Sequence, residues 1–372
     1  MKLFYCLIGF ILLQNKQVTY CQFADPLTVT APVMPKTVQV DDKKQAYYEL
    51  KLINKSDSAI KLVNLAIQFN DLAGKTYNIN NKELSSRLSI AVKSKTLAPG
   101  DEATVYLEVP FPDGLKEVTS ITHTLSYQYR NNNTVNHTRY QTRVSQQNPL
   151  TIASPLKQGY WAAVYDPSWP RGHRRVGFIF NDTSWIPGRF AIDFIRLNKF
   201  GQYATANKDS IKNWFGYGAE ILAVADGVIA AAVDTFAESS IISGHPVYDS
   251  SRATGNYLSL KLHDSAFAFY EHLQSGSITV QPGDTVKVGQ VLGRLGFTGQ
   301  STGPHLHFHI ADRNTPLAAQ GLPFHLKSFR NVGSYDNFTD FGVRVWKKIP
   351  AQSKGSKNPS RPASNTVIEF NE

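Results

Sequence analysis

The sequence predicts a mainly β protein made of two consecutive β-rich domains. Three observations point to this fold class. Apolar and polar residues alternate in short runs through both halves, turn signals such as Pro99-Gly100 separate these runs, and three histidines alternate with apolar residues near position 307. Of the 372 residues, 42% are hydrophobic and 18% are charged, so the chain has enough apolar side chains for packed cores, which argues against wholesale disorder.

Residues 22–147 are predicted to form an Ig-like β-sandwich. In one run the apolar residues Val63, Leu65, Ile67 and Phe69 occupy every second position, which is the period of a half-buried strand. Similar runs recur with turn residues at intervals of roughly ten residues, as in antiparallel sandwiches. The region contains no recognisable catalytic constellation, and we expect a spacer or adhesion-type module.

Residues 1–21 are predicted to be a secretory signal peptide. Lys2 precedes an apolar run, Leu3–Leu13, that is too short to span a bilayer but suits a signal core. An uncleaved anchor or a buried segment is the alternative. Both cysteines, Cys6 and Cys21, lie in this segment, so the mature chain would have no thiol nucleophile, disulfide or thiolate metal ligand.

The rest of the chain is divided by composition. Residues 148–160 are predicted to be a linker, residues 161–346 a second domain, and residues 347–372 a flexible basic tail rich in Ser, Pro, Lys and Asn. No later apolar run reaches eighteen residues, so we expect no transmembrane helix in the mature chain. The net charge of +10 suits an anionic partner such as a membrane surface, nucleic acid or cell-wall polymer, and does not choose among them.

The residues best suited to metal binding or catalysis lie in the second domain. In a strand, His305, His307 and His309 would share one face, while the apolar residues between them would face a core. Imidazole is a common metal ligand and a general base near neutral pH. A glycine-punctuated loop, residues 296–304, leads into this strand, and His272 ends an earlier strand-like run.

These motifs resemble the lysostaphin-like M23 family of zinc metallopeptidases. The matching segments, within residues 218–312, are Gly255-Asn256-Tyr257, Tyr270-Glu271-His272-Leu273, the turns Pro282-Gly283 and Gly289-Gln290, and Ser301-Thr302-Gly303-Pro304-His305-Leu306-His307-Phe308. The resemblance implies an M23-type antiparallel β-sheet domain. It also implies that His307 and Asp193 bind zinc, and that His272 and His305 act on water and substrate.

The sequence departs from the family pattern at Arg189, where a zinc-binding histidine usually stands four residues before the aspartate. A guanidinium stays protonated and has no lone pair for a cation. In one hypothesis His173, twenty positions before Asp193, supplies the missing ligand, as in β-lytic members with a longer loop. In the other, Asp193 and His307 are left alone, and the domain binds cell wall or regulates a partner wall hydrolase without cutting.

The resemblance therefore implies a secreted or periplasmic zinc metalloendopeptidase that hydrolyses peptide bonds in peptidoglycan, with zinc as the cofactor and a cell-wall peptide rather than nucleic acid as the partner. The export signal, the basic charge and the absence of disulfides fit the cell envelope. The turns at Gly283 and Gly289 also resemble those of lipoyl and biotinyl carrier domains. Such domains need a modifiable lysine at a hairpin tip, whereas Lys287 lies inside a strand-like run.

Overall fold

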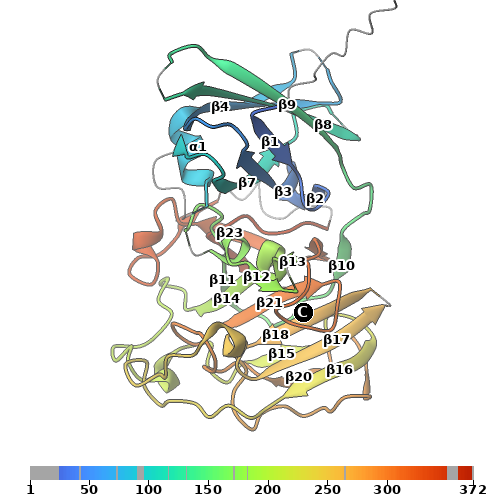
Figure 1. Ribbon diagram of the computed structural model, residues 1–372. Coiled ribbons are helices and arrows are strands. Elements are labelled where there is room, and N and C mark those ends of the chain that lie inside the picture. The colour runs from blue at the N-terminus through green and yellow to red at the C-terminus, as the bar shows by residue number, and fades with distance from the viewer. Residues whose placement is uncertain are drawn as a thin grey trace, which may run out of the picture.

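The computed structural model describes residues 25–370, except 42, 73, 90–95, 116, 131, 171, 182, 264 and 350–358. The predicted signal peptide and both cysteines lie outside the described residues. Strands dominate the rest, so the prediction of a mainly β fold is confirmed. Figure 1 shows the N-terminal strands stacked on the sheet of the second domain. No helix in the described part of the chain is long and apolar enough to span a membrane.

The N-terminal domain consists of two antiparallel sheets with a common core. The first sheet contains β1 (Leu27–Thr30), β2 (Lys36–Val40), β3 (Lys43–Asn54) and β7 (Glu102–Pro110). The second contains β4 (Ile60–Phe69), β5 (Thr76–Ile79), β6 (Thr96–Leu97), β8 (Ser120–Tyr129) and β9 (Asn136–Arg143), and the helix α1 (Asn81–Arg87) packs beside it. Alternate apolar side chains such as Leu50, Leu65 and Val105 are completely buried between the sheets. The arrangement is a β-sandwich, and its Ig-like character stays a prediction.

The second domain is built on a ten-stranded antiparallel sheet. In spatial order its strands are β19 (Thr285–Val286), β16 (Gly227–Val233), β17 (Tyr257–His263), β18 (Ala266–Glu271), β21 (Leu306–Ala311), β14 (Ile192–Leu197), β11 (Tyr160–Val164), β25 (Thr366–Glu369), β23 (Arg330–Ser334) and β24 (Lys347–Lys348). One face packs on the antiparallel pair β15 (Glu220–Leu222) and β20 (Val291–Arg294), where Phe194, Tyr270 and Phe308 are completely buried in the core.

A hairpin and several 3-10 turns lie in the connections between the strands of this sheet. The hairpin of β12 (Phe178–Phe180) and β13 (Thr183–Trp185) lies between two single-turn 3-10 helices, η1 (His173–Arg175) and η2 (Pro187–Phe190). Three further 3-10 turns are η3 (Ile211–Asn213), η4 (Ser250–Arg252) and η5 (Phe338–Asp340). The turns η1 and η2 are in contact with each other and connect β11 to β14.

The structure differs from the prediction at both flanks of the second domain. The predicted linker contains β10 (Leu150–Ile152), which pairs in parallel with β22 (Phe324–Leu326). The predicted flexible tail contains β25, which lies inside the ten-stranded sheet, and Val367, Ile368 and Phe370 are completely buried. The prediction of a flexible tail was wrong because it relied on composition. A polar, proline-containing stretch precedes a short apolar run, and this run is stable as a strand only because it pairs with β11 and β23.

The C-terminal segment also joins the two domains. Arg361, which is completely buried, donates its backbone N–H to the Gln39 carbonyl at 2.8 Å and accepts from the Asp41 N–H at 2.9 Å. Its guanidinium donates to the backbone carbonyls of Phe190 and Ala191 in the second domain. The domains therefore share a continuous, buried contact surface that reaches η2.

Candidate metal centre

Two adjacent strands bring the first pair of site residues together. Asp193 on β14 and His307 on β21 are direct partners in the antiparallel register, so their side chains lie on the same face of the sheet. His307 Nδ1 lies 2.9 Å from Asp193 Oδ1. The apolar neighbours of His307, Leu306 and Phe308, point into the core and anchor the strand, as the alternation predicts.

His173 reaches the same carboxylate from η1. Its Nε2 lies 2.9 Å from Asp193 Oδ2, and the donor atoms of His173, Asp193 and His307 all lie within 4.8 Å of one another. Arg189 on η2 points elsewhere: its guanidinium is buried and bonds Glu49 of the N-terminal domain at 2.9–3.2 Å. The geometry thus favours the hypothesis in which His173 supplies the third donor.

His272 and His305 stand beside this group with their orientations fixed by backbone carbonyls. His272 follows β18 in the left-handed region, at φ 63°, and its Nδ1 lies 2.8 Å from the Thr298 carbonyl. His305 precedes β21, and its Nδ1 lies 2.7 Å from the Gly303 carbonyl. A carbonyl can only accept, so in each neutral ring the hydrogen sits on Nδ1 and Nε2 keeps its lone pair.

The site carries one strongly stabilised negative charge. Burial opposes the ionised form of Asp193, but the neighbouring His173 and His305 outweigh it and hold the pKa of the carboxyl well below its usual range. Burial likewise opposes the charged form of His305, whose pKa is nevertheless raised by Asp193, 3.4 Å from its Nε2. Burial, assisted by His305 and His307, lowers the pKa of His272 well below its ordinary value.

The sequence patterns did not single out Glu271 as a site residue. It faces His307 in the register between β18 and β21, and burial, followed by Asp193, raises its pKa to about 8. His309 Nδ1 lies 3.6 Å from Glu271 Oε1, and the His309 ring stacks on Phe269. The available signal was its position next to His272 at the end of a strand that pairs with the histidine strand.

The donor set fits a zinc ion. Two imidazoles and one carboxylate are the ligand types of catalytic zinc sites, in which a fourth position stays open. Zinc–ligand bonds of about 2.0–2.2 Å place neighbouring donors of a tetrahedron roughly 3.3–3.6 Å apart, and the donor atoms of the three residues lie within 4.8 Å of one another. A cavity of about 380 Å³ adjoins the group, and its lining includes His173, Asp193, Glu271, His272, His305 and His307.

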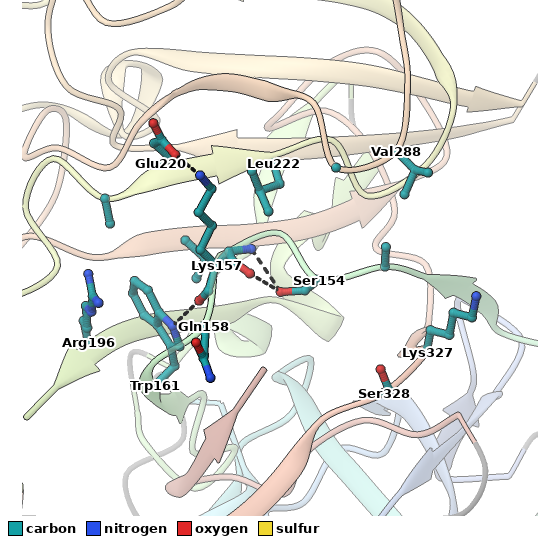
Figure 2. A pocket seen from close by; sticks show the side chains of 14 residues that line it. Ser154, Lys157, Gln158, Trp161, Arg196, Glu220, Leu222, Val288, Lys327 and Ser328 are labelled. Atoms are coloured by element: carbon teal, nitrogen blue, oxygen red, sulfur yellow. Dashed lines mark hydrogen bonds and ion pairs between the residues drawn. The ribbon is translucent and has the colours of Figure 1, made fainter. Parts of the chain in front are cut away.

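A wider cavity of about 990 Å³ offers different chemistry (Figure 2). It is lined by cationic and apolar side chains, among them Lys157, which pairs with Glu220, and Arg196. Arg196 lies three positions after Asp193 along β14, so the two side chains are on opposite faces of the sheet. The lining of this wider cavity contains no histidine and one carboxylate, so the smaller cavity is the candidate active site.

Fold and site together define a metallopeptidase-type domain. Residues 209–319 match the model of peptidase family M23, so the resemblance that the motifs predicted is confirmed for this part of the chain. The matched region contains His272, His305 and His307. His173 and Asp193 lie upstream of it.

Curated relatives resemble the chain over short segments. The peptidoglycan DD-endopeptidase ShyB of Vibrio cholerae is 46% identical over 66 residues, which cover 18% of this chain and 15% of ShyB. Lysostaphin of Staphylococcus staphylolyticus is 35% identical over 130 residues, 32% of this chain and 26% of lysostaphin. The chain thus spans about a quarter or less of these relatives. Among solved structures, the catalytic domain of the M23 protein EnpA from Enterococcus faecalis is 19% identical, with 47% of this chain and 93% of that domain covered and a TM-score of 0.27.

Proposed function

We propose that the chain is a zinc-dependent endopeptidase of the cell envelope, secreted or periplasmic, that hydrolyses peptide bonds in peptidoglycan. The observation that carries the proposal is the convergence of His173, Asp193 and His307 on one point beside His272 and His305. The match of residues 209–319 to peptidase family M23 and the similarity to a peptidoglycan endopeptidase support the substrate class.

In this proposal His173, Asp193 and His307 hold the zinc ion. A zinc ion held by these residues would supply Lewis acidity, which would activate water near neutral pH and polarise the scissile carbonyl. The two nitrogens that face the carboxylate, His173 Nε2 and His307 Nδ1, serve as neutral donors, and Asp193 contributes the negative charge that makes a buried cation tolerable.

His272 and His305 handle the proton and the developing charge. Because both rings keep their Nδ1 hydrogen on a backbone carbonyl, Nε2 is the atom that can accept a proton from the attacking water. As the C–N bond of the peptide breaks, a protonated Nε2 can return that proton to the leaving amine and donate a hydrogen bond to the carbonyl oxygen while it is negatively charged. The products are a carboxylate and an amine.

The test combines metal content with cell-wall digestion, using the chain without residues 1–21. We expect about one zinc per chain and release of new amino groups from purified sacculi, with both lost in His173→Ala. A matched control is His263→Ala, an exposed histidine at the end of β17, which is expected to keep both. Zinc at one per chain with no amine release from sacculi of several wall types would favour the non-catalytic alternative, in which the domain binds cell wall or regulates a partner hydrolase.

A further inference from the structure

His173 differs from the other site residues in how its ring is held. It lies on η1, in the connection between β11 and β12, whereas the other four residues belong to or directly adjoin strands of the main sheet. Metal-binding histidines usually donate their second nitrogen to an acceptor that orients the ring. His173 Nδ1 is buried and has no hydrogen-bond partner among the described residues. The orientation of this ring therefore depends on the position of η1 itself.

The turn η1 is tethered to the N-terminal sandwich. The next residue, Arg174, is 3% exposed, and its guanidinium donates to the Tyr48 carbonyl and to Glu49 Oε1, both at 3.0 Å. It also lies 2.6 Å from Glu108 Oε1. Arg175 packs its guanidinium over the ring of Tyr106, 5.2 Å from the centroid. Strands β3 and β7 of the other domain thus hold both residues that follow His173.

The same carboxylate holds the neighbouring turn η2. Glu49 accepts from Arg189 through both oxygens, at 2.9–3.2 Å, and all three members of the Arg174–Glu49–Arg189 cluster are less than 5% exposed. Turn η2 packs tightly on η1, since a methyl group at Gly188 would lie 2.9 Å from the His173 carbonyl oxygen. Removing one partner of a buried charge cluster is strongly destabilising because the remaining charges are left uncompensated.

We propose that Glu49 of the N-terminal sandwich is a positioning residue for the metal centre: it fixes η1 through Arg174 and η2 through Arg189, and thereby holds His173 against Asp193. This inference rests on the metal centre of the proposed function. It gives the N-terminal domain a part in the active site in place of the spacer role expected from its sequence. It also gives Arg189 a structural task in the position where the family usually has a metal ligand.

The central test is Glu49→Gln in the full chain, with the zinc dissociation constant measured by competition with a chelator. We expect zinc binding to weaken about 10- to 100-fold, the usual effect of losing a residue that supports a metal ligand. The visible spectrum of the cobalt-substituted protein should also change, since it reports the geometry of the ligands. The matched control is Asn54→Ala, which removes buried hydrogen bonds to Ser58 and Leu97 in the same domain but touches neither turn. It is expected to lower Tm and leave zinc affinity within twofold.

A double-mutant cycle separates positioning from general destabilisation. If Glu49 acts through the position of η1, then Glu49→Gln in a Gly188→Ala background, in which η1 is already displaced while all three donors remain, should weaken zinc binding by less than it does in the wild type. An additive loss, or an unchanged dissociation constant in Glu49→Gln alone, would overturn the inference. Absence of zinc from the wild-type protein would instead overturn the proposed function. Should Glu49→Gln fail to fold, Glu49→Asp keeps the buried negative charge but shortens its reach, and is expected to weaken zinc binding at least fivefold in a folded protein. Wild-type affinity in that variant would equally overturn the inference.

Discussion

The two halves of the candidate site are held in place by different means. Asp193 and His307 are placed by strand pairing, in which backbone hydrogen bonds fix the register and alternation fixes the face. His272 and His305 directly adjoin the paired strands β18 and β21, and backbone carbonyls orient their rings. His173 is placed by side-chain ion pairs that cross from one domain to the other. The residues placed by the sheet (Asp193, His272, His305 and His307, the sheet-borne half) should therefore keep their positions whenever the sheet is folded. The position of His173 (the loop-borne half) should change when single charged or small residues outside the site are substituted.

The largest effect is expected from removing the sheet-borne donor His307. In His307→Ala the zinc content should fall from about one per chain to background, and peptide-bond hydrolysis with it, because only two donors remain and catalytic zinc normally keeps three. The strand itself should survive, since its buried residues Leu306, Phe308 and Ile310 are unchanged. Elemental analysis and circular dichroism measure the two outcomes. Stoichiometric zinc in a folded His307→Ala protein would remove His307 from the site.

The second effect concerns a sheet-borne residue that is proposed to move the proton. His305→Ala should lower kcat about 10²- to 10⁴-fold, the usual contribution of general acid–base catalysis, while zinc stays bound. The reason is geometric: the His305 Nδ1 is committed to the Gly303 carbonyl, and its Nε2 lies beside the donor group. Kinetics on a short cell-wall peptide together with zinc analysis separate the roles. Loss of zinc in this variant would make His305 a ligand.

Much of the sheet-borne half could be predicted from the sequence. The alternation of His305, His307 and His309 with apolar residues is a local pattern, and the structure places all three around one cavity. The pairing of His307 with Asp193 is not local, because the two strands are far apart in the chain and only the packed sheet makes them neighbours. The motif resemblance, and not the alternation, suggested Asp193.

The loop-borne half could be predicted only as one of two alternatives. Arg189 showed that the usual ligand was missing, but the approach of His173 depends on Arg174 meeting Glu49 and Glu108, which no local pattern reveals. The error at the C-terminus has the same origin. The strand β25 is too short to be predicted from its own sequence. It forms because β11 and β23 pair with it on either side.

Acid should destabilise the N-terminal sandwich, which holds the turn that carries His173. His123 is buried in the N-terminal sandwich with its Nε2 2.8 Å from the Tyr48 hydroxyl, and burial lowers its pKa to about 4. In the unfolded chain the pKa is about 6.5, so between these values the unfolded state binds more protons and the folded state loses stability as the pH falls. The loss reaches about 3 kcal/mol near pH 4, because each pKa unit corresponds to about 1.4 kcal/mol.

Urea unfolding at pH 7 and pH 4.5, in wild type and in His123→Gln, measures this contribution. The variant should show a smaller decrease in the free energy of unfolding, because glutamine does not titrate in this range. Part of the decrease should remain, since burial also lowers the pKa of His325, at the domain junction, to about 4. Equal decreases in the two proteins would show that His123 is not the acid-sensitive group of the sandwich.

The smallest and most selective effect is expected from Gly188→Ala on η2. The added methyl group would lie 2.9 Å from the His173 carbonyl oxygen and 3.1 Å from its Cβ, so η1 and η2 must separate by a few tenths of an ångström. We expect zinc binding about tenfold weaker, similar to losing a contact that supports a ligand, and a modest decrease of Tm because a backbone atom of η1 must move. Gly177→Ala is the matched control in the same connection, because its methyl group meets no atom closer than 3.6 Å. Wild-type affinity in Gly188→Ala would mean that His173 tolerates displacement of its turn, and the contrast between the two halves of the site would then lose its energetic basis.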